Sequence, residues 1–231
     1  MTSSDRRFMV DEDMLEEIVG YATLNAEDSV LEVGAGSGNL TEKIAAVARV
    51  CAIEKERKLF ETLKGRVGGS KNATVMHGDA LKLAWPPYNK VVSNIPYSIS
   101  RRLLQRFVLE GFELAVLVVQ KEFAKKLCAA PGTDNYRMVS VLARSACDVE
   151  FLKDVPPDAF RPRPRVDSAV VRLRQRWKPP ADYLRFLNML FSKRNKMLKN
   201  VIEAPGEYGQ MKACQLSPDE IKGLFVGSHK G

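Results

Sequence analysis

The fold is decided by residues 29–38, SVLEVGAGSG, in which a β-rich run breaks into three closely spaced glycines. A helical stretch follows from about Leu40. Glycines directly after a strand permit positive φ and let a ligand approach the backbone, as at the mouth of a doubly wound sheet. The spacing is G-x-G-x-G, and it differs from the G-x-G-x-x-G of dinucleotide sites. We therefore expect a nucleotide-like ligand other than NAD at this turn.

Short β-rich runs alternate with helical runs over the first 130 residues or so of the chain. We predict strands at 29–33, 49–53, 73–76, 90–95 and 113–119, and helices at 11–22, 55–66 and 100–110, with others beginning near Leu40 and Lys121. This alternation indicates parallel strands joined by crossover helices, a Rossmann-like, doubly wound α/β fold. Runs at 138–142 and 166–173 predict late, antiparallel strands at one edge.

Prolines divide the chain. Six of the 12 prolines lie between residues 156 and 180, which predicts a stiff loop at 155–165 and a linker at 175–181. We therefore place a catalytic, ligand-binding domain at 1–177 and a small helical domain at 178–231. Its helices are predicted around residues 183–191 and 197–202. A segment this short buries little core alone, so it should pack on the α/β body.

Positive charge is concentrated in one part of the chain. The 231 residues include 36 Lys+Arg and 28 Asp+Glu, a net charge of +8, yet residues 161–200 alone carry +10. A concentrated positive region suits a polyanion, because neutralised phosphates release their counterions. A solvated, exposed face is the simpler alternative.

Membrane insertion, secretion and metal binding are not indicated. The longest apolar runs, near 113–119 and 138–143, are far shorter than the roughly 20 residues that cross a bilayer. No apolar leader precedes the first helix, so we expect a cytoplasmic protein. The four cysteines are dispersed and form no Cys-x-x-Cys pair, so we expect them to be reduced and mostly buried, with no metal site.

Ligand-facing residues recur at three successive strand ends. After the glycine loop, Glu54 ends the second strand and is placed to accept both hydroxyls of a ribose. Asp79 follows the third strand, where a carboxylate can accept a hydrogen bond from the amine of adenine. A single acidic residue at a strand end is common by chance. A glycine loop, Glu54 and Asp79 at three successive strand ends are much less so. Together they favour S-adenosylmethionine.

The fourth strand ends in Asn94-Ile95-Pro96-Tyr97, the most specific signal in the chain. The lone pair of an aromatic amine such as adenine N6 is delocalised into its ring, so catalysis has to draw it out. The Asn94 carbonyl and a backbone carbonyl held by Pro96 can accept both N6 hydrogens, while Tyr97 stacks on the extracted base. Standing alone, the tetrapeptide would read as a turn with a helix cap and a core aromatic.

The chain resembles the ribosomal RNA adenine N6,N6-dimethyltransferase family of the small-subunit type over nearly its whole length. The resemblance is carried by FMVD at 8–11, LEVGAGSGNLT at 31–41, IE at 53–54, GDA at 78–80, NIPY at 94–97, QKE at 120–122, PG at 131–132 with Tyr136, PPDAFRPRPRVDS at 156–168 and FSKRNKMLKN at 191–200. The last two stretches are more specific than the glycine loop, which S-adenosylmethionine enzymes share in general.

The resemblance implies a class I methyltransferase fold and a set of functional residues. Cofactor contacts are implied for Phe8, Glu32, Gly34, Gly36, Gly38, Glu54, Asp79, Ala80 and Asn94. Catalytic roles are implied for Asn94, the Pro96 carbonyl, Tyr97 and Phe160, with Phe160 packing on the base unless it plugs the core. RNA contacts are expected at Arg161, Arg163, Arg165, Lys193, Arg194, Lys196 and Lys199.

The implied reaction is dimethylation of two adjacent adenosines in the 3′-terminal hairpin of small-subunit rRNA, within an immature subunit and by a monomer. One alternative is a ribosome-assembly factor with secondary or no catalysis, for which Arg172, Arg174 and Arg176 would join the RNA contacts. Another is a methyltransferase of large-subunit rRNA. The arginine-rich stretch at 160–168 and the basic stretch at 193–199 argue against DNA adenine or protein glutamine substrates.

One departure from the family pattern predicts a compensating contact. Where the family has Gln followed by His or Asn, this chain has Arg6-Arg7, and that Gln holds the methionine end of the cofactor. We expect Arg6 to pair with the cofactor carboxylate instead. Replacing Arg6 by Ala should then weaken cofactor binding about tenfold, since a hydrogen bond to a charged group contributes about 1.5–3 kcal/mol. Unchanged affinity in calorimetry would eliminate this role.

Overall fold

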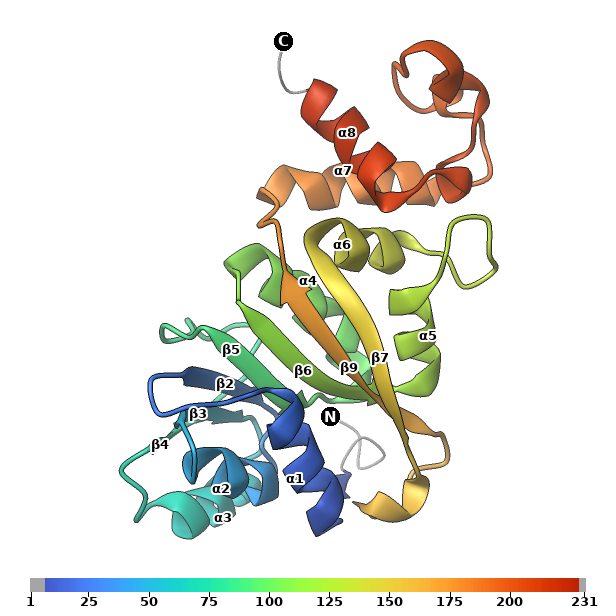
Figure 1. The fold of residues 1–231 in the computed structure, drawn as a ribbon. Coiled ribbons are helices and arrows are strands. Elements are labelled where there is room, and N and C mark those ends of the chain that lie inside the picture. The colour runs from blue at the N-terminus through green and yellow to red at the C-terminus, as the bar shows by residue number, and fades with distance from the viewer. Residues whose placement is uncertain (1–6, 229–231) are drawn as a thin grey trace.

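A seven-stranded, mainly parallel sheet forms the centre of the protein in a computed structural model, which describes residues 7–228 (Figure 1). Its strands, in spatial order, are β4 (Ala73–His77), β3 (Arg49–Glu54), β2 (Ser29–Val33), β5 (Lys90–Asn94), β6 (Leu114–Gln120), β9 (Ser168–Gln175) and β7 (Cys147–Val155). The five strands from β4 to β6 pair in parallel, whereas β9 runs antiparallel to both of its neighbours, β6 and β7. The predicted α/β fold and its five early strands are confirmed.

Helices cover both faces of the sheet. One face carries α1 (Glu12–Tyr21), α2 (Asn39–Ala45) and α3 (Arg57–Val67), and the other carries α4 (Ser100–Glu110), α5 (Lys121–Cys128) and α6 (Met138–Ala146). The first helix begins at its predicted cap, where the carboxylate of Asp11 accepts the Met14 amide N–H at 3.0 Å. Apolar residues of both faces are buried against the sheet, as crossover helices require.

Two predictions past residue 136 are corrected. Residues 138–142 form helix α6 and not a strand. The valines at 139 and 141 favoured a strand in the sequence, and this helix is short and almost completely buried. The edge strand β7 was missed in the sequence because seven of its nine residues are exposed or half-buried and a bulge between Phe151 and Lys153 interrupts their alternation. The strand predicted at 166–173 is confirmed as antiparallel β9.

The C-terminal segment is helical, with one prediction wrong. Helix α7 (Ala181–Ser192) forms as expected, but the helix predicted at 197–202 is a single 3-10 turn, Leu198–Asn200. Two further 3-10 turns (Gly206–Gln210 and Ala213–Gln215) lead to α8 (Pro218–Ser228), which was not predicted. Both helices contact α6.

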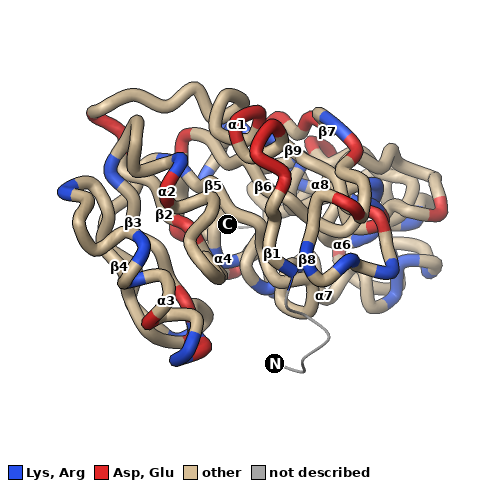
Figure 2. The backbone as a smooth tube through the Cα atoms, turned by 90° about the horizontal axis from the view of Figure 1, so that it is seen from below, with Lys and Arg blue, Asp and Glu red and all other residues tan. Residues whose placement is uncertain are grey.

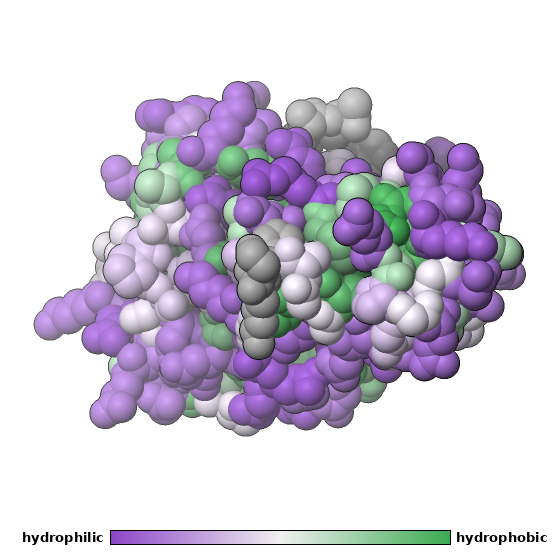
Figure 3. Space-filling model, turned by 90° about the horizontal axis from the view of Figure 1, so that it is seen from above, coloured by the Kyte–Doolittle hydropathy of each residue, from purple (hydrophilic) through white to green (hydrophobic). Residues whose placement is uncertain are grey.

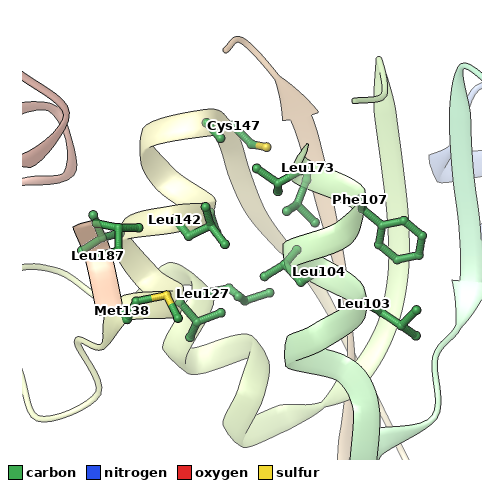
Figure 4. Close-up of a cluster of buried hydrophobic side chains, with 14 of the residues drawn as sticks. Leu103, Leu104, Phe107, Leu127, Met138, Leu142, Cys147, Leu173 and Leu187 are labelled. Carbon is green, nitrogen blue, oxygen red and sulfur yellow. The ribbon is translucent and has the colours of Figure 1, made fainter. Parts of the chain in front are cut away.

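One hydrophobic core joins the C-terminal helices to the α/β body. Leu187 of α7 packs with Met138 and Leu142 of α6, which in turn join Leu104 of α4 and Leu127 of α5 (Figure 4). The predicted packing of the C-terminal segment on the body is thus observed. The cluster of buried side chains is continuous across residues 177 and 178, so it marks no boundary there. The division into two domains at this point stays a prediction.

Two other sequence expectations concern cysteines and membranes. All four cysteines are free, but only Cys147 is buried, whereas Cys51, Cys128 and Cys214 are half-buried, so the expectation of mostly buried thiols was wrong. No helix within residues 7–228 combines the length and the apolar character that a bilayer span needs.

A buried ion pair joins the amino ends of β2 and β5 to the end of α1. The Lys90 ammonium lies 2.9 Å from a carboxylate oxygen of Asp28, and it also donates to the carbonyl oxygens of Ala22 and Thr23. Burial opposes ionisation of Asp28, yet hydrogen bonds from Asn89 and Lys90 lower its pKa overall. The Asp28 carboxylate is therefore ionised at neutral pH, and both partners of the pair are buried.

We predict that Asp28→Ala lowers the free energy of unfolding by about 3–5 kcal/mol, because it leaves the Lys90 charge buried without its partner. Chemical denaturation at pH 7 measures the loss. The control is Glu16→Ala, which removes one partner of the exposed Lys43 pair and should cost at most about 1 kcal/mol. Equal effects of the two substitutions would contradict a stabilising role for the buried pair.

Candidate active site

The order of the strands places a cavity at the carboxyl ends of β2 and β5. The sheet is wound in opposite directions from this pair, and ligands of open α/β sheets bind in the crevice at such a point. The cavity has an empty volume of about 720 Å³, part of which is open to solvent. Its walls are the glycine loop, the N-terminal arm at residues 7–9 and the tip at residues 94–97.

Glycine is required in the loop by close packing. A Cβ atom at position 34 would lie 2.9 Å from the Pro96 ring, and one at position 36 would lie 2.9 Å from the Phe8 ring. Both glycines have positive φ and line the cavity. Gly38 also has positive φ, but a Cβ there would lie 2.8 Å from Leu63 of α3. The described geometry therefore gives Gly38 a packing role and does not place it in the cavity wall.

Glu54 is held in the cavity wall by two backbone groups. One carboxylate oxygen accepts the Gly36 N–H at 2.9 Å and the other accepts the Glu56 N–H at 2.8 Å. The side chain is buried, so its orientation is restrained. Because a carboxylate oxygen accepts more than one hydrogen bond, each oxygen can still take a hydroxyl group of a ligand.

Glu32 is the most perturbed acid in this cavity. Burial raises its pKa to about 8 and the nearby Glu54 charge acts in the same direction, while a 2.6 Å hydrogen bond from the Thr41 hydroxyl opposes them. Its side chain is therefore largely protonated at pH 7. A cation entering the cavity beside it would favour the carboxylate form. The position thus suits the ammonium group of an amino-acid moiety.

An adjoining cavity contains Asp79 and Ala80, and it shares Gly34, Glu54 and Pro96 with the first. The Lys55 ammonium donates to one Asp79 oxygen at 2.9 Å, and the Leu81 N–H donates to the other at 3.0 Å. The hydrogen bond from Lys55 is the main reason why the pKa of Asp79 is lowered. The predicted ligand residues at three strand ends thus line two connected cavities.

The tip after β5 presents acceptor oxygens. The Asn94 side-chain amide donates to the Arg7 carbonyl at 3.2 Å, which leaves its Oδ1 atom as an acceptor. The Pro96 carbonyl already accepts both the Ile99 N–H and the Ser100 hydroxyl. Among residues 7–228, nothing donates to the Ile95 carbonyl. We therefore revise the second predicted acceptor from the Pro96 carbonyl to the Ile95 carbonyl.

Tyr97 is oriented from two sides. Its hydroxyl forms a hydrogen bond with the Ser168 hydroxyl at the start of β9, and the Arg7 guanidinium lies 4.7 Å from the centre of its ring. Arg7 and Ser168 were not among the predicted site residues. Both lie in or beside stretches that carry the family resemblance, but the sequence does not say which side chain meets Tyr97.

Phe160 does not line either cavity that holds the predicted cofactor residues. It is completely buried, because β8 (Phe160–Arg161) pairs with β1 (Phe8–Met9) of the N-terminal arm and covers it. In this conformation Phe160 plugs the core, the alternative noted from the sequence. The arm is further held by Asn39, whose side-chain amide donates to the Met9 carbonyl at 2.6 Å. Arg6, the predicted partner of the cofactor carboxylate, lies outside the described residues.

The predicted RNA-contacting residues fall into two separate groups. The first is the arginine loop, Arg161, Arg163 and Arg165, which are exposed and lie near the N-terminal arm. The second follows α7 at the opposite end of the molecule and comprises Lys193, Arg194, Lys196 and Lys199. Figure 2 shows basic segments around β8 and on the α6 and α7 side of the body. The structure therefore does not gather these residues into one patch.

Comparisons with known proteins agree with this geometry. The sequence model of the family described as "Ribosomal RNA adenine dimethylase" matches residues 2–224. The chain belongs to the ribosomal RNA adenine dimethylase family. A relative from Methanosarcina mazei, named "Probable ribosomal RNA small subunit methyltransferase A", is 35% identical over 240 residues, covering 94% of this chain and 89% of its own. A relative of the same name from Methanothermobacter thermautotrophicus is 41% identical over 196 residues, or 84% and 71% of the two chains.

Solved structures place this dimethylase-family chain among class I methyltransferases. A dimethyladenosine transferase from Plasmodium falciparum superposes with a TM-score of 0.84 at 25% identity, covering 96% of this chain and 98% of the other. The 23S rRNA methyltransferase ErmE gives a TM-score of 0.74 at 26% identity, with 95% and 98% covered. The class I fold implied by the sequence is thereby confirmed.

The raised pKa of Glu32 predicts a pH-dependent stability. Between its ordinary value and about 8, the unfolded chain has lost the proton that the folded chain keeps, so wild-type stability falls as pH rises through this window. Glu32→Gln removes this dependence. At pH 8 the free energy of unfolding of the variant should exceed that of wild type by about 4 kcal/mol, since one pKa unit corresponds to about 1.4 kcal/mol. Denaturation curves recorded from pH 5 to 8 measure this difference.

The control for this prediction is Glu27→Gln, an exposed glutamate at the turn before β2. This variant should follow the wild-type pH profile throughout. A Glu32→Gln profile parallel to wild type would show that Glu32 is ionised in the folded protein.

Proposed function

We propose that this protein uses S-adenosylmethionine to dimethylate N6 of two adjacent adenosines in the 3′-terminal hairpin of small-subunit rRNA. The substrate is an immature subunit in the cytoplasm, and the enzyme acts as a monomer. The observation that carries the proposal is the pair of acceptors at the tip of β5, Asn94 Oδ1 and the Ile95 carbonyl, beside a cavity lined by Glu54.

The residues of the two connected cavities fit the cofactor. Glycines at 34 and 36 leave room beside the backbone, Glu54 offers two fixed oxygens to a ribose, and Asp79 offers a restrained carboxylate to adenine. Glu32 is placed for the ammonium group of the methionine moiety. When bound, S-adenosylmethionine supplies an electrophilic methyl group on a sulfonium.

The tip activates a weak nucleophile by accepting hydrogen bonds. Asn94 Oδ1 and the Ile95 carbonyl accept the two N6 hydrogens of the target adenine, which favours a tetrahedral nitrogen with its lone pair free of the ring. The alkylated amine loses its proton to water, because a protonated aromatic amine is strongly acidic, so no side chain has to serve as general base. The second transfer to each adenosine acts on an N6-methyl amine, whose one remaining hydrogen is accepted by one of the two oxygens. Two transfers on each of two adenosines give four per RNA.

The base site is shaped by Tyr97 and the N-terminal arm. Arg7 packs on the Tyr97 ring, so a base that stacks there takes the place of the guanidinium. Ser168 holds the Tyr97 hydroxyl and thereby fixes the ring. Phe160 can reach a base only if β1 separates from β8, so its predicted role requires movement of the arm.

Small-subunit rRNA is favoured over the alternatives. Relatives that are 35% to 41% identical are named for the small subunit, whereas the large-subunit enzyme ErmE is 26% identical. The intact cavities favour catalysis over a purely structural role in assembly. We assign cofactor binding and catalysis to residues 1–177 and RNA docking to residues 178–231 together with the arginine loop.

Asn94→Ala should reduce methyl transfer to unmethylated small subunits by about 10²–10³-fold, the usual effect of removing one hydrogen-bonding group that acts in the transition state. Folding and cofactor affinity should be largely retained, because Glu54 and Asp79 remain in place. Transfer is measured with labelled cofactor, and the modified positions are then mapped on the rRNA.

The matched control is Asn25→Ala, which truncates an exposed asparagine in the turn before β2. It should transfer methyl groups at the wild-type rate. Substantial activity of Asn94→Ala would exclude the assigned role, and modification of large-subunit rRNA instead would exclude the proposed substrate.

A further inference from the structure

A groove separate from the active-site cavities lies between α4, α5, α6 and α7, and we call it the α4–α7 groove. Four cations line it, namely Arg101, Lys126, Arg137 and Arg194. Two aromatic rings, Phe123 and Phe191, lie among them. Only Arg194 belongs to the RNA-contacting residues predicted from the sequence.

The cations of this groove form few interactions with acids. Lys126 interacts electrostatically with the exposed Glu122 of the same helix, which pairs with Lys125. The guanidinium groups of Arg137 and Arg194 both donate to the Tyr136 carbonyl, at 3.0 and 3.1 Å, so a single oxygen holds two like charges close together. No Asp or Glu lines the groove. Among the ion pairs formed within residues 7–228, none includes any of the four cations. An anion bound here would relieve their mutual repulsion.

Other arginines of the chain, unlike the cations of the groove, form ion pairs with acids. Arg163 pairs with Asp158 at 3.0 Å, and Arg172 of β9 pairs with Glu150 of β7 at 2.7 Å. These charges are partly neutralised within the protein. The α4–α7 groove therefore presents a stronger local positive field than these paired arginines do.

The two aromatic rings of the groove favour a nucleic acid over other anions. Phe123 and Phe191 are half-buried, and Phe191 packs edge-on against Tyr136 with ring centroids 6.0 Å apart, which holds it in place. Cations that track phosphates, combined with rings that stack bases, are the combination found where proteins bind single-stranded nucleic acid. The face over α7 and α8 is largely hydrophilic with interspersed apolar patches, unlike a continuous apolar protein interface (Figure 3).

The position of the groove links the active site to the C-terminal helices. Arg101 lies in the first turn of α4, four residues after Tyr97, whereas Arg194 follows the end of α7. We infer that the α4–α7 groove binds an unpaired segment of the substrate RNA, with phosphates on its four cations and a base against Phe123 or Phe191. The inference rests on the proposed function and names a second region of the same substrate.

A triple variant, Arg101→Gln with Lys126→Gln and Arg137→Gln, tests this inference on the full-length protein. Its affinity for unmethylated small subunits should fall at least tenfold in filter binding. The slope of log affinity against log salt should become shallower by about two to three, since each lost phosphate contact removes roughly 0.7–0.9. The affinity for S-adenosylmethionine should be unchanged, because none of these residues lines the cofactor cavities.

The matched control is Lys58→Gln with Lys64→Gln and Lys71→Gln, which removes the same charge from exposed positions on and after α3. This control should bind small subunits within about twofold of wild type. Arg137 also forms hydrogen bonds at the start of α6, so Arg101→Glu, at an exposed position, serves as an independent variant and should weaken binding at least threefold. Equal affinities of the groove variants and the α3 control would overturn the inference.

Crosslinking identifies what occupies the groove. With p-benzoylphenylalanine in place of Phe123, irradiation of the complex should join the protein to small-subunit rRNA. A crosslink to a ribosomal protein would overturn the inference in favour of an acidic protein surface. Failure of wild type to methylate small subunits would instead count against the proposed function, whereas wild-type methylation with unaffected groove variants counts against the groove alone.

Discussion

The site depends on one steric constraint, the approach of the glycine loop to the tip of β5. Because position 34 has no side chain, the Pro96 ring packs where a Cβ atom would lie only 2.9 Å away. This contact holds the backbone of the glycine loop against the tip of β5, where we propose that the target amine binds. A methyl donor and its acceptor have to meet within bonding reach, so close packing of these two turns is a condition for transfer. Two residues later in the same loop, Gly36 allows the Phe8 ring an equally close approach.

The N-terminal arm orients the Asn94 side chain and also covers the Tyr97 ring. Its carbonyl at Arg7 takes the amide hydrogen of Asn94, and the β1–β8 pairing ties it to the arginine loop. Asn94 is thereby held with its acceptor oxygen available, which is the orientation that an incoming amine needs. The guanidinium of Arg7 covers the Tyr97 ring at the same time. The arm thus prepares the acceptor groups while it shields the aromatic surface on which a base would stack.

Charge is distributed in three places, each with a different partner. Buried acids at the strand ends are held by backbone amides and a hydroxyl, the arginine loop is exposed near the arm, and the α4–α7 groove holds cations without acids. RNA is recognised largely through its shape and backbone, so separated basic regions can contact distant parts of one folded substrate. The groove includes Arg194 of the second predicted group and reaches Arg101, four residues after Tyr97, so it would extend the RNA path from the C-terminal segment toward the active site.

The sequence alone determined the α/β class, the positions of the first five strands along the chain and the strand-end residues Glu54, Asp79 and Asn94. These depend on local periodicity and on turns that glycine and proline impose. It misassigned 138–142, where valines favour a strand within a nearly fully buried helix, and it missed α8, whose glycines at 223 and 227 weaken the helical pattern. Only the tertiary structure decided that the Pro96 carbonyl is already bonded, that Phe160 is covered by β1, and that Arg137 and Arg194 share one carbonyl. Each of these contacts joins groups that either lie on different elements or compete for one oxygen, and local sequence patterns carry no information on such distances.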